Sequence, residues 1–151
     1  MKSVLIIDIK TDNSAFESIV QKSIHILDEQ GVTYSKICVN HILEAPIALR
    51  FAIETFRSNH DKNSKRPDGY MVFGFVSKSE DLETVVYEEF LRSLQDMACY
   101  YGLALSHHTH FESQSSPKNS DSIAQQIVYS CLDLIQLKRQ LGLQSSHINT
   151  P

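Results

Sequence analysis

Short apolar runs alternate with longer amphipathic stretches along this chain. The runs are of strand length and rich in Ile, Val and Phe, which predicts β-strands over residues 3–9, 33–39, 70–75 and 103–111. Apolar residues at helical spacing predict helices over residues 13–30, 47–59, 82–102 and 122–141. One helix between successive strands implies right-handed crossovers. The pattern therefore predicts an α/β fold, a doubly wound three-layer α/β/α sandwich around a four-stranded parallel sheet.

Composition and charge narrow the class of protein. The chain has 151 residues, 42% hydrophobic and 21% charged, so we expect a single domain over residues 1–142 and a disordered tail over 143–151. A net charge of −4 argues against nucleic acid or an anionic membrane as a partner. Neither a membrane-spanning run nor a signal peptide is indicated, which predicts a cytoplasmic protein. Two of the three widely spaced cysteines are expected to be reduced thiols in the core.

Polar loops follow each predicted strand and carry the candidate chemistry. In the stretch Gly69–Leu94, an apolar strand leads into Ser77–Asp81, which offers two hydroxyls, a lysine and two carboxylates just before a helix. The carboxyl ends of parallel strands meet at one edge of the sheet, and small polar ligands bind there. The other loops expected at that edge are residues 10–13, residues 40–44 and His107–His110.

Each candidate also has a plainer interpretation. Residues 77–79 are compatible with a phosphate site or with a helix cap beside a solvated lysine, and they lack the glycine of a P-loop. Glu44 alone fits a first-turn carboxylate favoured by the helix dipole. The histidines at 107, 108 and 110 favour a pocket-lining or interfacial group over a zinc site, because spacing indicates no third ligand. Asp8 lacks the second acidic neighbour of a phospho-accepting receiver domain.

Several segments fit the pattern of one family. Val39–Pro46 keeps the glutamate and proline of a G-A-F-E-[IL]-P loop. Gly74–Thr84 keeps the first glycine, the valine, the cation and one acid of G-x-V-I-[RK]-G-[DE]-T-x-H-[FY]. Gly102–Leu105 and Leu132–Leu134 match a G-[VL]-P-[VL] segment and a final-helix L-[DE]-[LM]. Over Val4–Leu141 the chain therefore resembles the 6,7-dimethyl-8-ribityllumazine synthase family of riboflavin biosynthesis.

This resemblance implies a flavodoxin-like fold of the lumazine synthase type and a condensation without cofactor or metal. A ribitylaminopyrimidinedione and a four-carbon keto phosphate would join, losing phosphate and water, in a site between adjacent subunits of a pentamer or larger shell. Glu44 would accept ribityl hydroxyls, the backbone of Val76 and Ser77 would pair with the pyrimidine, and N–H groups of Glu80 and Asp81 would hold phosphate. The implied substrate-binding residues are Thr11, Asp12, Ile42, Leu43, Glu44, Val76, Ser77, Lys78, Glu80, Asp81 and His107.

The departures from the family pattern fall on the residues that the family uses for proton transfer and substrate binding. The proton-transferring histidine falls on Glu83, or on Leu82 if the alignment slips by one residue, and Glu83 is the candidate catalytic residue. The aromatic residue that stacks on the pyrimidine falls on Thr11, and the phenylalanine of an F-G-V-L-T turn falls on His107. The phosphate-binding arginine has no clear counterpart, and Lys118 is the only cation in its shortened segment.

These departures leave three hypotheses open. General acid–base catalysis is worth about 10²–10⁴-fold in rate, and stacking on an aromatic ring about 1–3 kcal/mol, so a slow but active lumazine synthase is compatible with both losses. The second hypothesis is a non-catalytic oligomeric protein on the same fold, either shell-forming or binding a flavin or other ligand. The third is a flavodoxin-like or receiver-type monomer, which a pentameric mass would exclude.

Overall fold

A computed structural model describes residues 1–58, 66–78, 83–113 and 119–142. Strands and helices alternate strictly in that part of the chain, as the hydrophobic pattern predicts. The elements are β1 (Ser3–Ile9), α1 (Ser14–Glu29), β2 (Thr33–Val39), α2 (Glu44–Ser58), β3 (Gly69–Val76), α3 (Glu83–Tyr101), β4 (Leu105–Phe111) and α4 (Ser120–Gln140). The expected tail over 143–151 lies outside the described residues.

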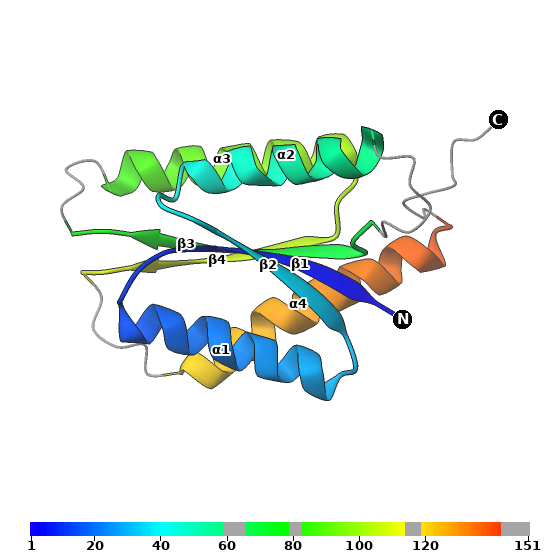
Figure 1. Cartoon of the computed structure of the whole chain (residues 1–151), viewed down its shortest axis with the longest axis horizontal. Helices are drawn as coiled ribbons and strands as arrows, with labels where there is room; N and C mark the ends of the chain where they lie inside the picture. Colours follow the sequence, from blue (N-terminus) through cyan, green and yellow to red (C-terminus); the bar gives the residue numbers. More distant parts are fainter. Residues whose placement is uncertain (59–65, 79–82, 114–118, 143–151) are drawn as a thin grey trace.

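The four strands form one parallel sheet in the order β2-β1-β3-β4. Helices α1 and α4 cover one face of the sheet, and α2 and α3 cover the other (Figure 1). This arrangement confirms the predicted α/β sandwich with a four-stranded parallel sheet, consistent with the lumazine synthase type. Strands β2 and β4 are the two edges of the sheet, so their outer sides have no strand partner among the described residues.

Strand β3 is buried along its whole length, as expected for a strand covered on both faces. Gly74 lies near its carboxyl end, where a Cβ atom would meet Ile42 Cδ1 at 2.8 Å and the Phe90 ring at 3.1 Å. Glycine at this position therefore lets the loop after β2 and helix α3 pack closely on the end of β3. That close packing places the β2–α2 loop beside the candidate site.

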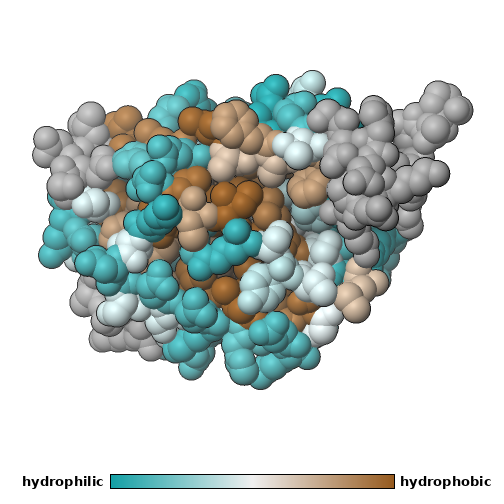
Figure 2. Space-filling model, in the orientation of Figure 1, coloured by the Kyte–Doolittle hydropathy of each residue, from teal (hydrophilic) through white to brown (hydrophobic). Residues whose placement is uncertain are grey.

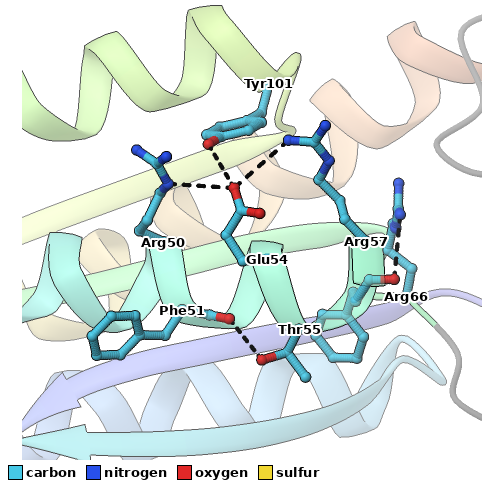
Figure 3. A network of polar contacts seen from close by, with 8 residues as sticks. Arg50, Phe51, Glu54, Thr55, Arg57, Arg66 and Tyr101 are labelled. Carbon is cyan, nitrogen blue, oxygen red and sulfur yellow. Dashed lines mark hydrogen bonds and ion pairs between the residues drawn. The ribbon is translucent and has the colours of Figure 1, made fainter. Parts of the chain in front are cut away.

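A charged cluster joins α2 to α3 at the edge of the sheet opposite to the strand carboxyl ends (Figure 3). Glu54 Oε1 accepts a hydrogen bond from the Tyr101 hydroxyl at 3.1 Å and pairs with Arg50 at 3.4 Å and Arg57 at 3.6 Å. Both guanidinium groups lie within 6 Å of the Tyr101 ring centre, which is cation–π distance. This cluster fixes the scaffold and lies far from the candidate chemistry.

One expectation about burial is wrong. Two buried cysteines were expected, but only Cys131 is buried, and Cys38 and Cys99 are exposed. Cys38 lies on an edge strand, whose residues are all at least partly exposed.

Candidate functional site at the carboxyl edge of the sheet

The register of the strands brings their carboxyl ends to one edge. Ile9 pairs with Val39, and Val76 pairs with Phe111, so the segments that follow β1, β2, β3 and β4 start side by side. The sheet order also reverses between β1 and β3, because the chain leaves β1 toward β2 on one side and continues to β4 on the other. In open α/β sheets this is the crevice in which ligands bind.

The loop after β1 is held by its own hydrogen bonds. The backbone N–H of Lys10 donates to Val39 O at 2.7 Å, which joins this loop to the end of β2. Thr11 Oγ1 accepts the N–H of Asn13 at 3.1 Å, and Asn13 Oδ1 caps α1 by accepting the N–H of Phe16 at 2.9 Å. Thr11 is half-buried and Asp12 is exposed, so the loop presents a threonine and a carboxylate to the edge of the sheet.

The loop after β2 positions Ile42, Leu43 and Glu44. Ile42 is buried against β3, whereas Leu43 is 38% exposed. Glu44 begins α2, and its Oε1 accepts the N–H groups of Asn40 at 2.8 Å and His41 at 3.1 Å. The carboxylate therefore satisfies two backbone N–H groups just ahead of the helix. Both bonds go to Oε1, and the Glu44 side chain is exposed.

The ends of β3 and β4 are tied together. Glu112 follows β4, and its N–H donates to Val76 O at 2.9 Å. Its carboxylate Oε1 accepts the N–H of Lys78 at 2.8 Å. Ser77 between these two points is half-buried, and Lys78 is exposed. Glu83 is the half-buried first residue of α3, and Glu80, Asp81, Leu82 and Lys118 lie outside the described residues.

The histidine segment does not form a loop at this edge, which corrects the expectation from sequence. Residues 107–110 lie inside β4, because the β-pairing with β3 continues to Phe111. His107 pairs with Val72, four residues before Val76, and is therefore about 13 Å along the strand from the carboxyl edge. The structure thus does not bring His107 to the other candidate residues of the same chain.

His107 and His108 instead line a cavity of about 400 Å³ beside the outer edge of β4 and helix α4. The cavity is lined by Leu105, Ser106, His107, His108, Ile123, Gln126, Ile127 and Ser130. Burial lowers the pKa of His107. Burial, helped by the neighbouring His110 and His107, lowers the pKa of His108 to about 4. These imidazoles are therefore neutral hydrogen-bonding groups at neutral pH.

His110 is the most enclosed of the three histidines, with 2% of its surface exposed. Its ring stacks on Phe75 with a centroid distance of 6.0 Å, and Phe75 in turn packs against Phe16 of α1 at 5.5 Å. Burial lowers the pKa of His110, and its Nε2 has no hydrogen-bond partner in the part of the chain that the structure describes. The residue therefore behaves as part of the core beneath the edge of the sheet.

A polar cluster that the sequence did not indicate lies between β1 and β2. Asp8 is 1% exposed, and its Oδ1 accepts the Cys38 thiol at 2.8 Å while Oδ2 pairs with Lys36 Nζ at 3.1 Å. Burial lowers the pKa of Lys36, but the hydrogen bond and charge of Asp8 outweigh this, so the pKa is raised. Burial and then Asp8 raise the pKa of the Cys38 thiol, which stays protonated at neutral pH as a donor.

The sequence missed both Glu112 and the Asp8 cluster for the same reason. Lys36 and Cys38 are two residues apart and share a strand face, but only the register of β1 against β2, which pairs Asp8 with Cys38, brings Asp8 to them. Glu112 directly follows the predicted strand over 103–111, and only the register of β3 against β4 brings it to Lys78. Among the described residues, no three His, Cys, Asp or Glu side chains gather as a metal site. None of the described helices is long and apolar enough to cross a bilayer.

Fold and site together define a doubly wound α/β protein whose polar loops lie at the carboxyl edge of its sheet. No protein-family model matches the chain. The 6,7-dimethyl-8-ribityllumazine synthase of Paramagnetospirillum magneticum (strain ATCC 700264 / AMB-1) is 28% identical over 152 residues, which cover 96% of this chain and 100% of that protein. The 6,7-dimethyl-8-ribityllumazine synthase 1 of Rhizobium meliloti (strain 1021) is 28% identical over 103 residues, 68% of this chain and 65% of that protein.

These two similarities support the chain as a divergent member of the lumazine synthase family, and they support a riboflavin-pathway function at the level of the family.

Proposed function

We propose that this protein condenses a ribitylaminopyrimidinedione with a four-carbon keto phosphate to give 6,7-dimethyl-8-ribityllumazine. The observation that carries the proposal is the similarity to a named lumazine synthase along 96% of the chain. Apart from His107, the described segments that the resemblance assigns to substrate lie at one edge of the sheet, which supports the same reaction.

The β2–α2 loop offers a site for the ribityl chain. Ile42 and Leu43 would supply apolar contacts, and Glu44 would accept hydroxyl hydrogen bonds through Oε2 while Oε1 holds its own loop. A carboxylate whose position is already fixed by two backbone N–H groups loses little freedom when a ligand binds. Its geometry is therefore suited to orienting a polyhydroxyl chain.

The β3–α3 segment would hold the pyrimidine and the reacting centre. The backbone of Val76 and Ser77 would pair with the ring, and the exposed cation of Lys78 follows them directly. Condensation of an amine with a ketone, with loss of water and phosphate, requires proton transfers, for which Glu83 at the start of α3 is the candidate. Most of the rate would come from holding the two substrates in proximity and in the right orientation.

We further propose that the site is completed by a second copy of the chain. Hydrophobic residues gather in the middle of the face that carries β2 and along α2 above it (Figure 2). Tyr34 on β2 is 40% exposed, and Ile47 and Phe51 on α2 are 53% and 67% exposed, together with Leu43. Exposed apolar patches of this kind mark association surfaces. A neighbouring subunit is also the route by which a residue such as His107 would reach the site.

A non-catalytic, ligand-binding assembly is the second candidate. It is favoured by Thr11, whose hydroxyl bonds its own loop where the resemblance implies a stacking ring. Under this alternative the wild type gives no turnover, and the double substitution Thr11→Phe with Glu83→His creates activity.

The test incubates the purified full chain with both substrates and follows the fluorescence of the lumazine product. The proposal predicts a rate above the uncatalysed condensation and a loss of about 10²-fold or more in Glu83→Gln, as expected for removal of an acid–base group. A rate equal to the uncatalysed reaction would refute it.

A further inference from the structure

Glu112 ties the ends of β3 and β4 in an unusual way. Its backbone N–H donates to Val76 O at 2.9 Å, which continues the parallel hydrogen-bond pattern one residue past Phe111. In a parallel ladder the next bond would run from the N–H of Lys78 to the backbone carbonyl of Glu112. Here the Lys78 N–H donates instead to Glu112 Oε1 at 2.8 Å. A side-chain carboxylate therefore takes the place of the backbone acceptor.

This side-chain hydrogen bond holds the segments after β3 and β4 together beyond the last residue of either strand. Hydrogen bonds to a carboxylate are stronger than bonds to a neutral carbonyl. The backbone at Ser77 is thus fixed on both sides, by the carbonyl of Val76 and by the N–H of Lys78. The contact therefore acts on the residues that directly follow β3, before α3 begins at Glu83.

We propose that Glu112 is a positioning residue of the substrate site. It holds the backbone of Val76 and Ser77 in the form that pairs with the pyrimidine, an assignment that rests on the proposed function. A backbone edge that is ordered before binding loses less conformational entropy when the ligand arrives. Glu112 therefore acts on pyrimidine affinity and not on the chemical step.

The test compares the wild type with Glu112→Ala and Glu112→Gln. In the free protein, hydrogen exchange at the Lys78 amide should accelerate about tenfold or more in Glu112→Ala, because a hydrogen bond to a charged group is lost. Exchange at Met71 in the middle of β3 should not change. The KM for the pyrimidine should rise about tenfold with kcat within about twofold, and the glutamine, which keeps an acceptor oxygen, should restore most of both effects.

Glu89→Ala is the matched control for loss of one carboxylate, because Glu89 pairs with Arg92 on the exposed surface of α3. It should leave both the exchange rates and KM unchanged. An unchanged Lys78 exchange rate in Glu112→Ala would overturn the proposal, and so would faster exchange with an unchanged KM. A wild type that neither binds the pyrimidine nor turns over would instead overturn the proposed function, and with it the role assigned to Glu112. The exchange data would still show whether the Lys78–Glu112 hydrogen bond forms.

Discussion

At the scale of single residues, Asp8 is an ionisable group that the fold encloses near the carboxyl end of β1. A buried carboxylate is costly unless it is paired and hydrogen-bonded, and here Lys36 and Cys38 supply one contact to each oxygen. The Lys36 side chain is only 29% exposed, so its attraction to Asp8 is less screened than that of a surface pair. The cluster therefore matters for the stability of the β1–β2 pair.

Replacing Lys36 with methionine should expose this dependence. Lys36→Met keeps the apolar stem but leaves the Asp8 carboxylate buried without its cation, which should lower the free energy of unfolding by about 2–3 kcal/mol in urea titrations. Lys22→Met is the matched control, because Lys22 pairs with Asp121 in side chains that are 40% and 80% exposed. Its effect should stay below about 1 kcal/mol. Equal losses in the two variants would contradict the role given to the buried pair.

Single residues were also the least predictable level of the structure. Ile42, Glu44 and Val76 could be placed from sequence because each lies where an apolar run ends. Asp8 and Glu112 could not, since their partners are 30 and 34 residues away along the chain. The strand register that joins such partners depends on tertiary packing, which local sequence patterns do not encode.

At the scale of elements, the alternation of β and α was predictable because apolar run length and periodicity differ clearly between strands and helices. The residues at which these elements begin and end were less predictable. Helix α2 begins at Glu44, three residues before the predicted start at residue 47. The Glu44 side chain accepts the N–H groups of the preceding residues and so extends the first turn. Strand β4 begins at Leu105, two residues later than predicted, and ends at Phe111 as predicted.

The histidines of β4 make this strand sensitive to acid. The pKa of His108 is about 4 in the folded protein and about 6.5 in an unfolded chain, so the unfolded state binds a proton more readily between these values. Its contribution to stability is therefore fully present above pH 6.5 and is lost as the pH falls toward 4. Urea unfolding should show a loss of up to about 2 kcal/mol from this residue between pH 7.5 and pH 5.

His108→Gln should flatten this pH dependence, because glutamine does not titrate. The same substitution at the exposed His25 of α1 should leave the dependence as it is in the wild type. Identical pH slopes in the wild type and His108→Gln would show that the enclosed histidines of β4 do not control acid stability.

At the scale of the whole molecule, the apolar residues on β2 and α2 point to association between copies. Phe51 on α2 is 67% exposed, so the free chain leaves a large aromatic ring in water. Phe51→Glu should convert an oligomer into smaller species in light scattering, because a charge cannot be buried there without a partner. Tyr100→Glu, which alters a residue 79% exposed at the far end of α3, should keep the wild-type mass. A monomeric wild type would contradict the assembly.

The central claim is that a divergent carboxyl-edge site still makes 6,7-dimethyl-8-ribityllumazine. Its most direct test is the rate at which the purified protein forms fluorescent product from the pyrimidine and the keto phosphate. We predict turnover above the uncatalysed condensation, reduced about 10²-fold or more in Glu83→Gln. Product formation at the uncatalysed rate would contradict it.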